Sequence, residues 1–305
     1  MDRVNTATAG LTRRSGQDLP NFIVIGAMKA GTTSLYQYLK AHDEVFMPAI
    51  KELDFFVAES NWSRGIEWYR RQFNTSEAAR ARGEASTLYT QYPTHDGVPE
   101  RMVRVLPDVR LVYVVRDPVE RMRSHYEHLV ITGAEKRPPE VALLQNPIYL
   151  ACSKYAMQLQ RYLDHFPREQ ILIVTSEGLK GERRATVQQV YEFLGVDPTH
   201  LPDVLGTEFY QTARRRAYPP ALLWARRLAK RHMLQGERAK VLVDSMLARG
   251  TSEGRTPAAD ETPDPNDATQ VLGPELRKQL ADLLGDDVAR FARHMPADFD
   301  GWGLT

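Results

Sequence analysis

The sequence predicts an α/β fold of three layers, in which a mainly parallel central sheet is flanked by helices. Three short apolar runs, at Asn21–Gly26, Arg110–Pro118 and Gln170–Leu179, are each followed by a segment whose apolar residues have helical spacing. Strands that alternate with helices are typical of parallel sheets, whose strands are buried on both faces. Ligands of such folds bind beyond the carboxyl ends of the strands, so the residues after each run are the first candidates for a site.

The first run leads into a glycine loop, VIGAMKAGTTSLYQYL, at residues 24–39. Gly26 and Gly31 have the spacing of the phosphate loop G-x-x-x-x-G-K-[ST], so the predicted fold is P-loop-like. Thr32 stands where that motif has its lysine, and Lys29 lies inside the loop instead. Backbone N–H groups and hydroxyls at the start of the following helix favour a bound phosphate, which Lys29 would approach from the loop. The alternative is a tight strand-to-helix turn that needs small residues for packing alone.

The second run ends in a polar strand-to-helix junction, RDPVERMRSHY. Arg116 lies at the strand end, Pro118 opens the helix, and Ser124 follows Arg116 by about two helical turns. A guanidinium and a hydroxyl that converge on one anion predict a second phosphate site. The alternative is a surface helix with ordinary arginine–glutamate pairs, which accounts for Glu120 and Arg123 and leaves Arg116 unexplained.

The remainder of the chain extends this pattern into one domain, which we place at residues 20–305. Residues 217–249 are basic and have helical spacing, and an amphipathic helix is expected over residues 272–295. Residues 250–269 are rich in Gly, Pro, Thr and Asp, which predicts a flexible loop or lid. Residues 1–19 are polar and are expected to form a flexible leader.

Composition limits the partners and the compartment. The formal net charge of the 305 residues is +1, which argues against a general nucleic-acid binder. Cys152 is the only cysteine, which excludes an internal disulfide and a cysteine-based zinc site. No apolar run approaches the roughly 20 residues of a membrane span, and the leader lacks the apolar centre of a signal peptide. We therefore expect a cytoplasmic protein without stable membrane insertion, and these features leave its oligomeric state open.

Together these motifs resemble the sulfotransferases that use 3′-phosphoadenosine 5′-phosphosulfate (PAPS). The glycine loop is similar to that family's 5′-phosphosulfate loop, and RDPVERMRSHY is similar to its 3′-phosphate motif. MPAIKELDFFV, followed by GIEWYRRQF, resembles the heparan-sulfate and related carbohydrate branch, whose members carry a glutamate before an aromatic pair. The resemblance covers residues 21–195. In GEASTLY, Ala85 and Thr87 stand where members have a lysine and a proline, so a lysine contact to an acidic polysaccharide is not expected.

The resemblance implies a role for each matching residue. Glu52 falls on the catalytic base of that branch, and Lys29 on the lysine that contacts the bridging oxygen of the donor. Arg116 and Ser124 fall on the pair that grips the 3′-phosphate, and Tyr155 matches a helix that approaches the cofactor or the acceptor. The donor-binding set is completed by Ala30, Gly31, Thr32, Thr33 and Ser34 at the 5′-phosphate and by the basic run Arg214, Arg215 and Arg216, for which a solvated charge run is an equal alternative.

The function implied is transfer of a sulfuryl group from PAPS to a hydroxyl or an amine. The acceptor would be a sugar or a glycosylated or lipid-linked small molecule. Adenosine 3′,5′-bisphosphate would be the second product, and no metal would be needed.

Two other functions stay open. A P-loop nucleotide or small-molecule kinase would need a lysine after Gly31 and a magnesium-binding aspartate, for which Asp117 is the candidate at a strand end. A non-catalytic nucleotide-binding scaffold would keep the fold without turnover. For Glu52 the alternative is a surface ion pair with Lys51, and the rival bases are His42, His95, His125 and Glu84.

Overall fold

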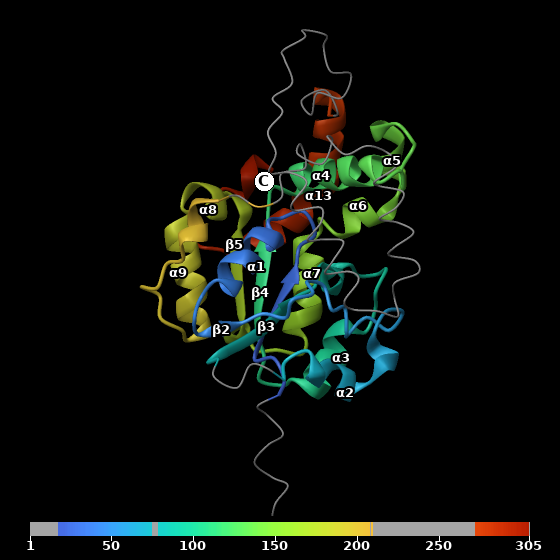
Figure 1. The fold of residues 1–305 in the computed structure, drawn as a ribbon. Helices are drawn as coiled ribbons and strands as arrows, with labels where there is room; N and C mark the ends of the chain where they lie inside the picture. Colours follow the sequence, from blue (N-terminus) through green and yellow to red (C-terminus); the bar gives the residue numbers. More distant parts are fainter. Residues whose placement is uncertain (1–17, 75–78, 208, 210–271, 305) are drawn as a thin grey trace, which may run out of the picture.

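A computed structural model describes residues 18–74, 79–207, 209 and 272–304 (Figure 1). Within them, five strands form one sheet in the order β2-β3-β1-β4-β5, and every neighbouring pair is parallel. The strands are β1 Phe22–Gly26, β2 Val45–Phe46, β3 Ala81–Ala85, β4 Arg110–Val115 and β5 Ile171–Thr175.

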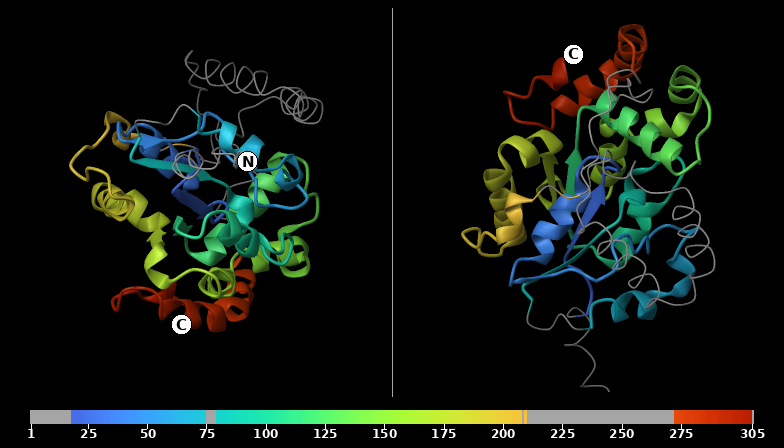
Figure 2. Two further views of the ribbon diagram at one scale, coloured as in Figure 1. Left: turned by 90° about the horizontal axis from the view of Figure 1, so that it is seen from below. Right: turned by 45° about the horizontal axis from the view of Figure 1, so that its top comes forward.

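Helices cover both faces of this sheet (Figure 2). α1 and α9 lie together on one side, where the Tyr191 hydroxyl donates to the Tyr38 carbonyl, and α7 and α13 lie on the other, where Tyr155 packs on Phe291. The three-layer α/β fold is therefore confirmed. The helices are α1 Thr32–Lys40, α2 Ile66–Arg71, α3 Val98–Val105, α4 Pro118–Ile131, α5 Pro139–Gln145, α6 Pro147–Ala151, α7 Tyr155–Leu163, α8 Ser176–Gly181, α9 Arg183–Leu194 and α13 Pro274–Ala292.

The central strands build the core, and a second apolar cluster attaches the C-terminal helix. The side chains of Ile23–Ile25 and Leu111–Val115 are fully buried, as expected for strands covered on both faces. The second cluster joins α4 to α13 and includes Val119, Met122 and Leu280. It fixes α13 against the helix that carries Ser124, one of the two predicted 3′-phosphate residues.

Two of the predicted strands end earlier than expected. β5 stops at Thr175, whereas the predicted strand extended to Leu179. The Thr175 Oγ1 accepts a hydrogen bond from the Gly178 N–H at 3.0 Å, so this hydroxyl caps α8 and turns the chain out of the sheet. The second predicted strand likewise stops at Val115, because Pro118 opens α4.

The predicted helix near the C-terminus is present as α13. Several other predictions fall outside the described residues: most of the leader at 1–19, the basic stretch at 217–249, the loop or lid at 250–269, and Arg214–Arg216. In the part of the chain that the structure describes, no helix has both the length and the apolar character to cross a membrane.

Candidate active site

Three neighbouring strands end at one edge of the sheet. β3, β1 and β4 lie side by side and run in the same direction, so their carboxyl ends meet at that edge. β1 leads into the glycine loop at residues 27–31, and β4 leads into Arg116. The Glu52 N–H donates to the carbonyl of Ala85, the last residue of β3, at 3.0 Å. Three predicted site segments therefore lie where α/β folds bind ligands.

The glycine loop is held by its own backbone and opens a helix toward a ligand. The Ala27 N–H donates to the Val114 carbonyl at 2.5 Å, and the Ala30 N–H donates to the Ala27 carbonyl at 3.1 Å. Lys29 has a φ of 72°, and Gly31, the N-cap of α1, has a φ of 101°, a conformation that favours glycine. The N–H groups of the first turn of α1 have no partner within the helix, which makes this end a candidate for anion binding.

Gly26 has a packing role of its own. A Cβ atom here would lie 2.0 Å from the Thr90 Oγ1, and the Thr90 hydroxyl donates to the Ile25 carbonyl at 3.2 Å. The packing alternative therefore accounts for Gly26. The groups suited to a bound phosphate are the first-turn N–H groups of α1, Lys29 and the arginine that follows β4.

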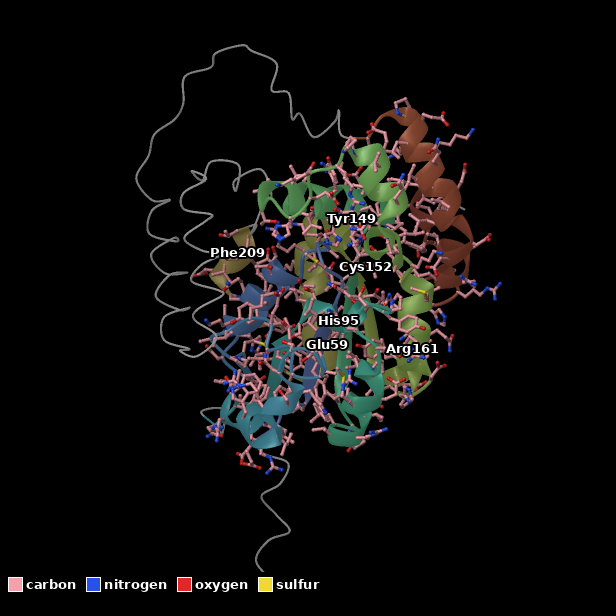
Figure 3. The ribbon with its side chains drawn as sticks, turned by 90° about the vertical axis from the view of Figure 1, so that its right-hand side faces the viewer. Glu59, His95, Tyr149, Cys152, Arg161 and Phe209 are labelled. Carbon is pink, nitrogen blue, oxygen red and sulfur yellow. The ribbon has the colours of Figure 1, made fainter. Side chains whose placement is uncertain are left out.

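α1 also contacts the chain beyond α9. The Ser34 hydroxyl donates to the Phe209 carbonyl at 3.0 Å, and the Tyr38 hydroxyl donates to the Thr207 carbonyl at 2.8 Å (Figure 3). The Ser34 hydroxyl proton is therefore used within the protein, and the backbone N–H is the donor that Ser34 retains for a ligand. Of the residues predicted at the 5′-phosphate, Ala30, Thr32 and Ser34 are buried, and Lys29, Gly31 and Thr33 are half-buried.

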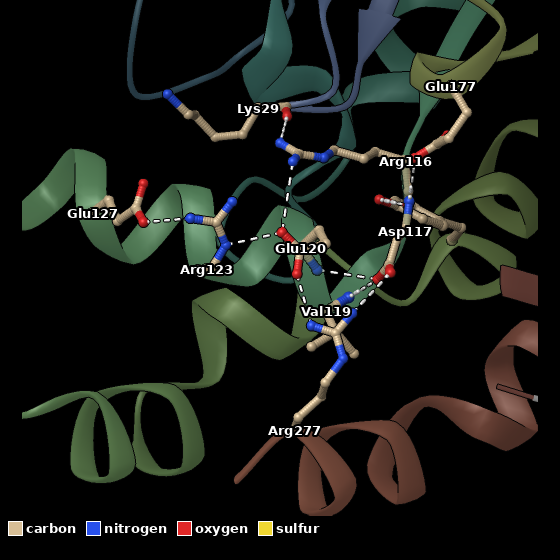
Figure 4. Close-up of polar contacts among 10 residues, drawn as sticks. Lys29, Arg116, Asp117, Val119, Glu120, Arg123, Glu127, Glu177 and Arg277 are labelled. Atoms are coloured by element: carbon tan, nitrogen blue, oxygen red, sulfur yellow. Dashed lines mark hydrogen bonds and ion pairs between the residues drawn. The ribbon is translucent and has the colours of Figure 1, made fainter. Parts of the chain in front are cut away.

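Arg116 connects the glycine loop to α4. Its Nη1 donates to the Lys29 carbonyl at 3.4 Å, and its side chain is 16% exposed (Figure 4). The Tyr155 hydroxyl donates to the Arg116 carbonyl at 2.8 Å. Tyr155 is fully buried, and burial raises the pKa of its hydroxyl. In this structure the contact of Tyr155 with the site is therefore its hydrogen bond to the main chain of Arg116.

Charged side chains surround Arg116 at the start of α4 (Figure 4). Glu120 accepts hydrogen bonds from Arg123 at 2.8 Å and from Arg277 of α13 at 2.7 Å, and it lies 3.8 Å from Arg116. Burial raises the pKa of Glu120, but the hydrogen bonds from Arg277 and Arg123 outweigh it, so the pKa is lowered and the carboxylate is charged. Asp117 caps α4 by accepting two first-turn N–H groups, at 2.8 and 3.0 Å, which disfavours the metal role of a kinase.

Ser124 lies on the buried side of α4, with 5% of its surface exposed. One turn earlier, Arg121 is fully buried and donates to the Met28 carbonyl of the glycine loop at 3.4 Å. Two arginines thus hold two successive carbonyls of the loop, those of Met28 and Lys29. The structure brings both predicted phosphate segments into contact through these bonds.

Glu52 lies over the end of β3. Its side chain is 43% exposed, and its Oε1 accepts from the Lys51 Nζ at 2.9 Å and from the Thr87 Oγ1 at 3.3 Å. The surface pair with Lys51, considered as an alternative from the sequence, is therefore present. Thr87, two residues after the end of β3, adds a second contact that holds the carboxylate near that strand end.

A buried carboxylate fixes the segment that follows Glu52. Glu84 is 1% exposed, and Ser86, one of its donors, accepts a hydrogen bond from the Asp54 N–H at 3.0 Å. Because Glu84 is enclosed and fully hydrogen-bonded, it is a poor alternative as the base. Its three hydroxyl donors are Tyr69, Ser86 and Tyr89, at 2.7, 2.6 and 2.8 Å.

The rival histidines differ in their access to a substrate. His42 is 2% exposed, and both of its ring nitrogens contact backbone groups. His125 is also 2% exposed, and burial followed by the charge of Arg121 lowers its pKa to about 2, so it is neutral. His95 lies beside Glu59 at 3.3 Å, with 17% of its side chain exposed (Figure 3). Of the three, His95 is the best alternative to Glu52.

Arg121 is a residue of the site that the sequence motifs did not predict. A signal was present, because Arg121 precedes Ser124 by three residues and His125 by four, the spacing of neighbours on one helical face. A buried arginine needs hydrogen-bond acceptors. The sequence does not reveal that one of them is a carbonyl of the glycine loop.

Comparisons with known proteins agree with this geometry. A family model of the sulfotransferase domain matches residues 19–213. Mouse heparan sulfate glucosamine 3-O-sulfotransferase 5 is 33% identical over 60% of this chain and 55% of its own length. Mouse bifunctional heparan sulfate N-deacetylase/N-sulfotransferase 4 is 31% identical over 59% of this chain, and the match spans only 23% of that relative.

A solved structure is similar over nearly all of both chains. The crystal structure of a sulfotransferase from Alicyclobacillus acidocaldarius is 26% identical to this chain and superposes with a TM-score of 0.65. The match covers 93% of this chain and 98% of the other.

Proposed function

The chain belongs to the sulfotransferase domain family, and we propose that it transfers a sulfuryl group from PAPS to a hydroxyl or an amine of its acceptor. One observation carries the proposal, namely the order of groups along the carboxyl edge of the sheet. Glu52 lies at β3, the Lys29 loop follows β1, and Arg116 follows β4. A PAPS molecule lying across this edge would meet the proposed base first, then the phosphosulfate loop, and then the arginine for its 3′-phosphate.

The groups at this edge suit the two phosphates of PAPS. The first turn of α1 offers backbone N–H groups and the positive end of its dipole to the 5′-phosphosulfate, and Lys29 adds a cation. Arg116, on the neighbouring strand end, is available to the 3′-phosphate, which PAPS has and ATP lacks. Ser124 lies on α4, which begins two residues after Arg116, and is the proposed second ligand of that phosphate.

In the proposed reaction the acceptor oxygen or nitrogen attacks sulfur in line with the leaving group. A bond from sulfur to the acceptor forms, and the bond from sulfur to the bridging oxygen of the 5′-phosphate breaks. The bonding electrons remain on that oxygen, and Lys29 stabilises the negative charge that grows there. Glu52 takes the proton that the acceptor loses. The products are the sulfated acceptor and adenosine 3′,5′-bisphosphate, and no step of this scheme uses a metal ion.

We assign the acceptor to sugars and glycosylated or lipid-linked small molecules. Two relatives named for heparan sulfate support a sugar, although this chain matches 55% of one and 23% of the other. Ala85, in place of the lysine expected from the resemblance, favours an acceptor that is smaller or less acidic than heparan sulfate. We place the reaction in the cytoplasm, with no nucleic-acid partner.

Mass spectrometry of acceptors incubated with the protein and PAPS tests the proposal. Amino sugars, neutral sugars and glycosylated lipids form the panel, and one of them is expected to gain a single SO₃ while adenosine 3′,5′-bisphosphate accumulates. A parallel reaction with ATP and Mg²⁺ in place of PAPS should leave every acceptor unchanged. Phosphorylation in that second reaction, without sulfation in the first, would replace the proposal with a kinase.

A further inference from the structure

Arg121 is a fully enclosed cation on α4. Its guanidinium donates to the Ser153 Oγ at 2.6 Å, to the Tyr149 carbonyl at 2.7 Å and to the Met28 carbonyl at 3.4 Å. These oxygens carry no charge, and among the described residues no carboxylate oxygen lies within 4.0 Å of its nitrogens. Because water cannot solvate a side chain that is 0% exposed, a charge without a counterion here is unfavourable unless an anion binds nearby.

The neighbouring arginines differ from Arg121 in this respect. Arg123 donates to Glu120 at 2.8 Å and to Glu127 at 2.5 Å, so its charge is balanced by two carboxylates. Arg116 lies 3.8 Å from Glu120. Arg121 therefore stands out on this helix as a buried arginine whose partners are all uncharged.

His125 does not share the charge of Arg121. Its Nδ1 lies 3.3 Å from the Arg121 Nη1, and a ring nitrogen that faces a donor must accept, which puts the ring proton on Nε2. Burial is the main cause that lowers the pKa of His125 to about 2, and the charges of Arg121, His128 and Lys29 also contribute. His125 is therefore neutral, and the charge of the pair remains on the Arg121 guanidinium.

The bond to Met28 connects this charge with the predicted 5′-phosphate site. In a trans peptide the C=O and the N–H point in opposite directions, so a Met28 carbonyl held by Arg121 turns the Lys29 N–H away from α4. A hydrogen bond that the carbonyl accepts also polarises the peptide group, which makes its N–H a stronger hydrogen-bond donor. Arg116 holds the next carbonyl, that of Lys29, in the same way.

We propose that Arg121 is a positioning residue for the 5′-phosphosulfate of the donor. It fixes the Met28–Lys29 peptide in the orientation that binds the 5′-phosphate, and its buried charge is balanced when that anion arrives. Arg116 serves the 3′-phosphate directly, whereas Arg121 serves the 5′ end from behind the loop. This inference rests on the proposed function, because both roles presuppose a nucleotide with these two phosphates.

Calorimetric titration with two nucleotides separates the 5′ contribution from the rest. The full chain is titrated with adenosine 3′,5′-bisphosphate and with adenosine 3′-monophosphate, and the ratio of the two affinities measures what the 5′-phosphate adds. In Arg121→Met this ratio should fall by about tenfold or more, as for a lost interaction with a charged group. Affinity for adenosine 3′-monophosphate should stay unchanged.

Two further variants keep the test decisive. Methionine leaves Ser153 and the Tyr149 carbonyl without their donor and can impair folding, so Arg121→Lys is measured beside it. Lysine keeps the charge but lacks the planar fork, and the ratio should fall by about threefold or more. Arg123→Met is the matched control, because it makes the same change on the same helix where two carboxylates already balance the charge, and its ratio should equal that of the wild type.

Three results would overturn the inference. An unchanged ratio in a folded Arg121 variant would separate Arg121 from the 5′ site. An equal loss for both nucleotides would reduce its role to general stability of the fold. A wild-type protein that binds neither nucleotide would remove the proposed function itself, and this failure appears before any variant is made.

Discussion

Arg116 contacts both phosphate segments, because its side chain donates to the Lys29 carbonyl and its own carbonyl is held by Tyr155. Arg116→Ala should weaken binding of adenosine 3′,5′-bisphosphate by about 1.5–3 kcal/mol, the usual loss for a hydrogen bond to a charged group. Turnover at saturating PAPS should change much less. Calorimetry gives the affinity, and adenosine 5′-monophosphate serves as the comparison ligand, whose affinity should fall less because it has no 3′-phosphate. An unchanged affinity for the bisphosphate would contradict the 3′-phosphate assignment.

Glu52 is assigned to the acceptor side of the transferred group and Lys29 to the donor side. Their variants should therefore differ in whether donor affinity falls together with the rate. Glu52→Gln keeps the acceptor for Lys51 and Thr87 but removes the base, and it should lower single-turnover rates by about 10²–10⁴-fold with donor affinity unchanged. Lys29→Ala should lower both, because the lysine acts on the bound donor and on the leaving oxygen.

Paired measurements on these two variants decide the assignment of the base. Single-turnover transfer is followed beside calorimetric titration with adenosine 3′,5′-bisphosphate. Near wild-type rates in Glu52→Gln would move the search to His95, which lies beside Glu59 and is the most accessible of the rival histidines.

At the scale of elements, the junction between β4 and α4 depends on Asp117. Its carboxylate accepts two first-turn N–H groups, and loss of such a cap costs about 0.5–2 kcal/mol. Asp117→Ala should lower the free energy of unfolding by that amount, measured with urea. Asp117→Asn is the control, because its amide oxygen still caps the helix. The asparagine loses the ion pair that Asp117 makes with the half-exposed Arg277 at 3.4 Å, and this pair should contribute little to stability. Equal destabilisation by both substitutions would show that the ion pair, and not the cap, stabilises this junction.

Elements with a strong local pattern could be predicted from the sequence, and elements stabilised by distant partners could not. β1, β4, β5 and α13 follow from apolar runs and helical periodicity. β3 contains Arg82, Gly83 and Glu84, a polar stretch without an apolar run, and its place in the sheet comes from pairing with β1 and β2, which are distant in the sequence. Hydroxyls of Tyr69, Ser86 and Tyr89 satisfy its buried Glu84. β2, with two residues, is too short to leave a pattern.

The same distinction applies to the site. Lys29 and Arg116 follow strands that the motifs located in the sequence. Glu52 was located by the resemblance, and its contact with the end of β3 is visible only in the fold. The partner of Arg121, a carbonyl about ninety residues earlier in the chain, has no counterpart in local spacing. Thr87 appeared in the sequence as a departure from the family pattern, and only the fold shows that its hydroxyl donates to Glu52.

For the whole molecule, the buried His125 predicts a loss of stability in mild acid. Its pKa in the folded chain is about 2, well below the value of about 6.5 for an exposed histidine. Between these values only the unfolded chain binds the proton, so this contribution is complete above about pH 6.5 and declines as the pH falls, by up to about 1.4 kcal/mol per pH unit.

His125→Asn tests that prediction, because the amide oxygen can still accept from Arg121 and does not titrate. Urea unfolding of both proteins is measured at several pH values from 7.5 down to 4. The free energy of unfolding of the variant should decline less steeply below pH 6.5. Parallel curves for the two proteins would mean that His125 is accessible to protons in the folded state.

The most direct test of the proposed sulfuryl transfer is a reaction of the purified protein with ³⁵S-labelled PAPS and a responsive acceptor, carried out in excess EDTA. We expect labelled acceptor and adenosine 3′,5′-bisphosphate to form in equal amounts, at a rate that the chelator does not change, because Lys29, Glu52 and Arg116 supply the charges that the reaction needs. Loss of transfer in EDTA with recovery on adding Mg²⁺, or tight binding of PAPS without transfer to any acceptor, would contradict this account.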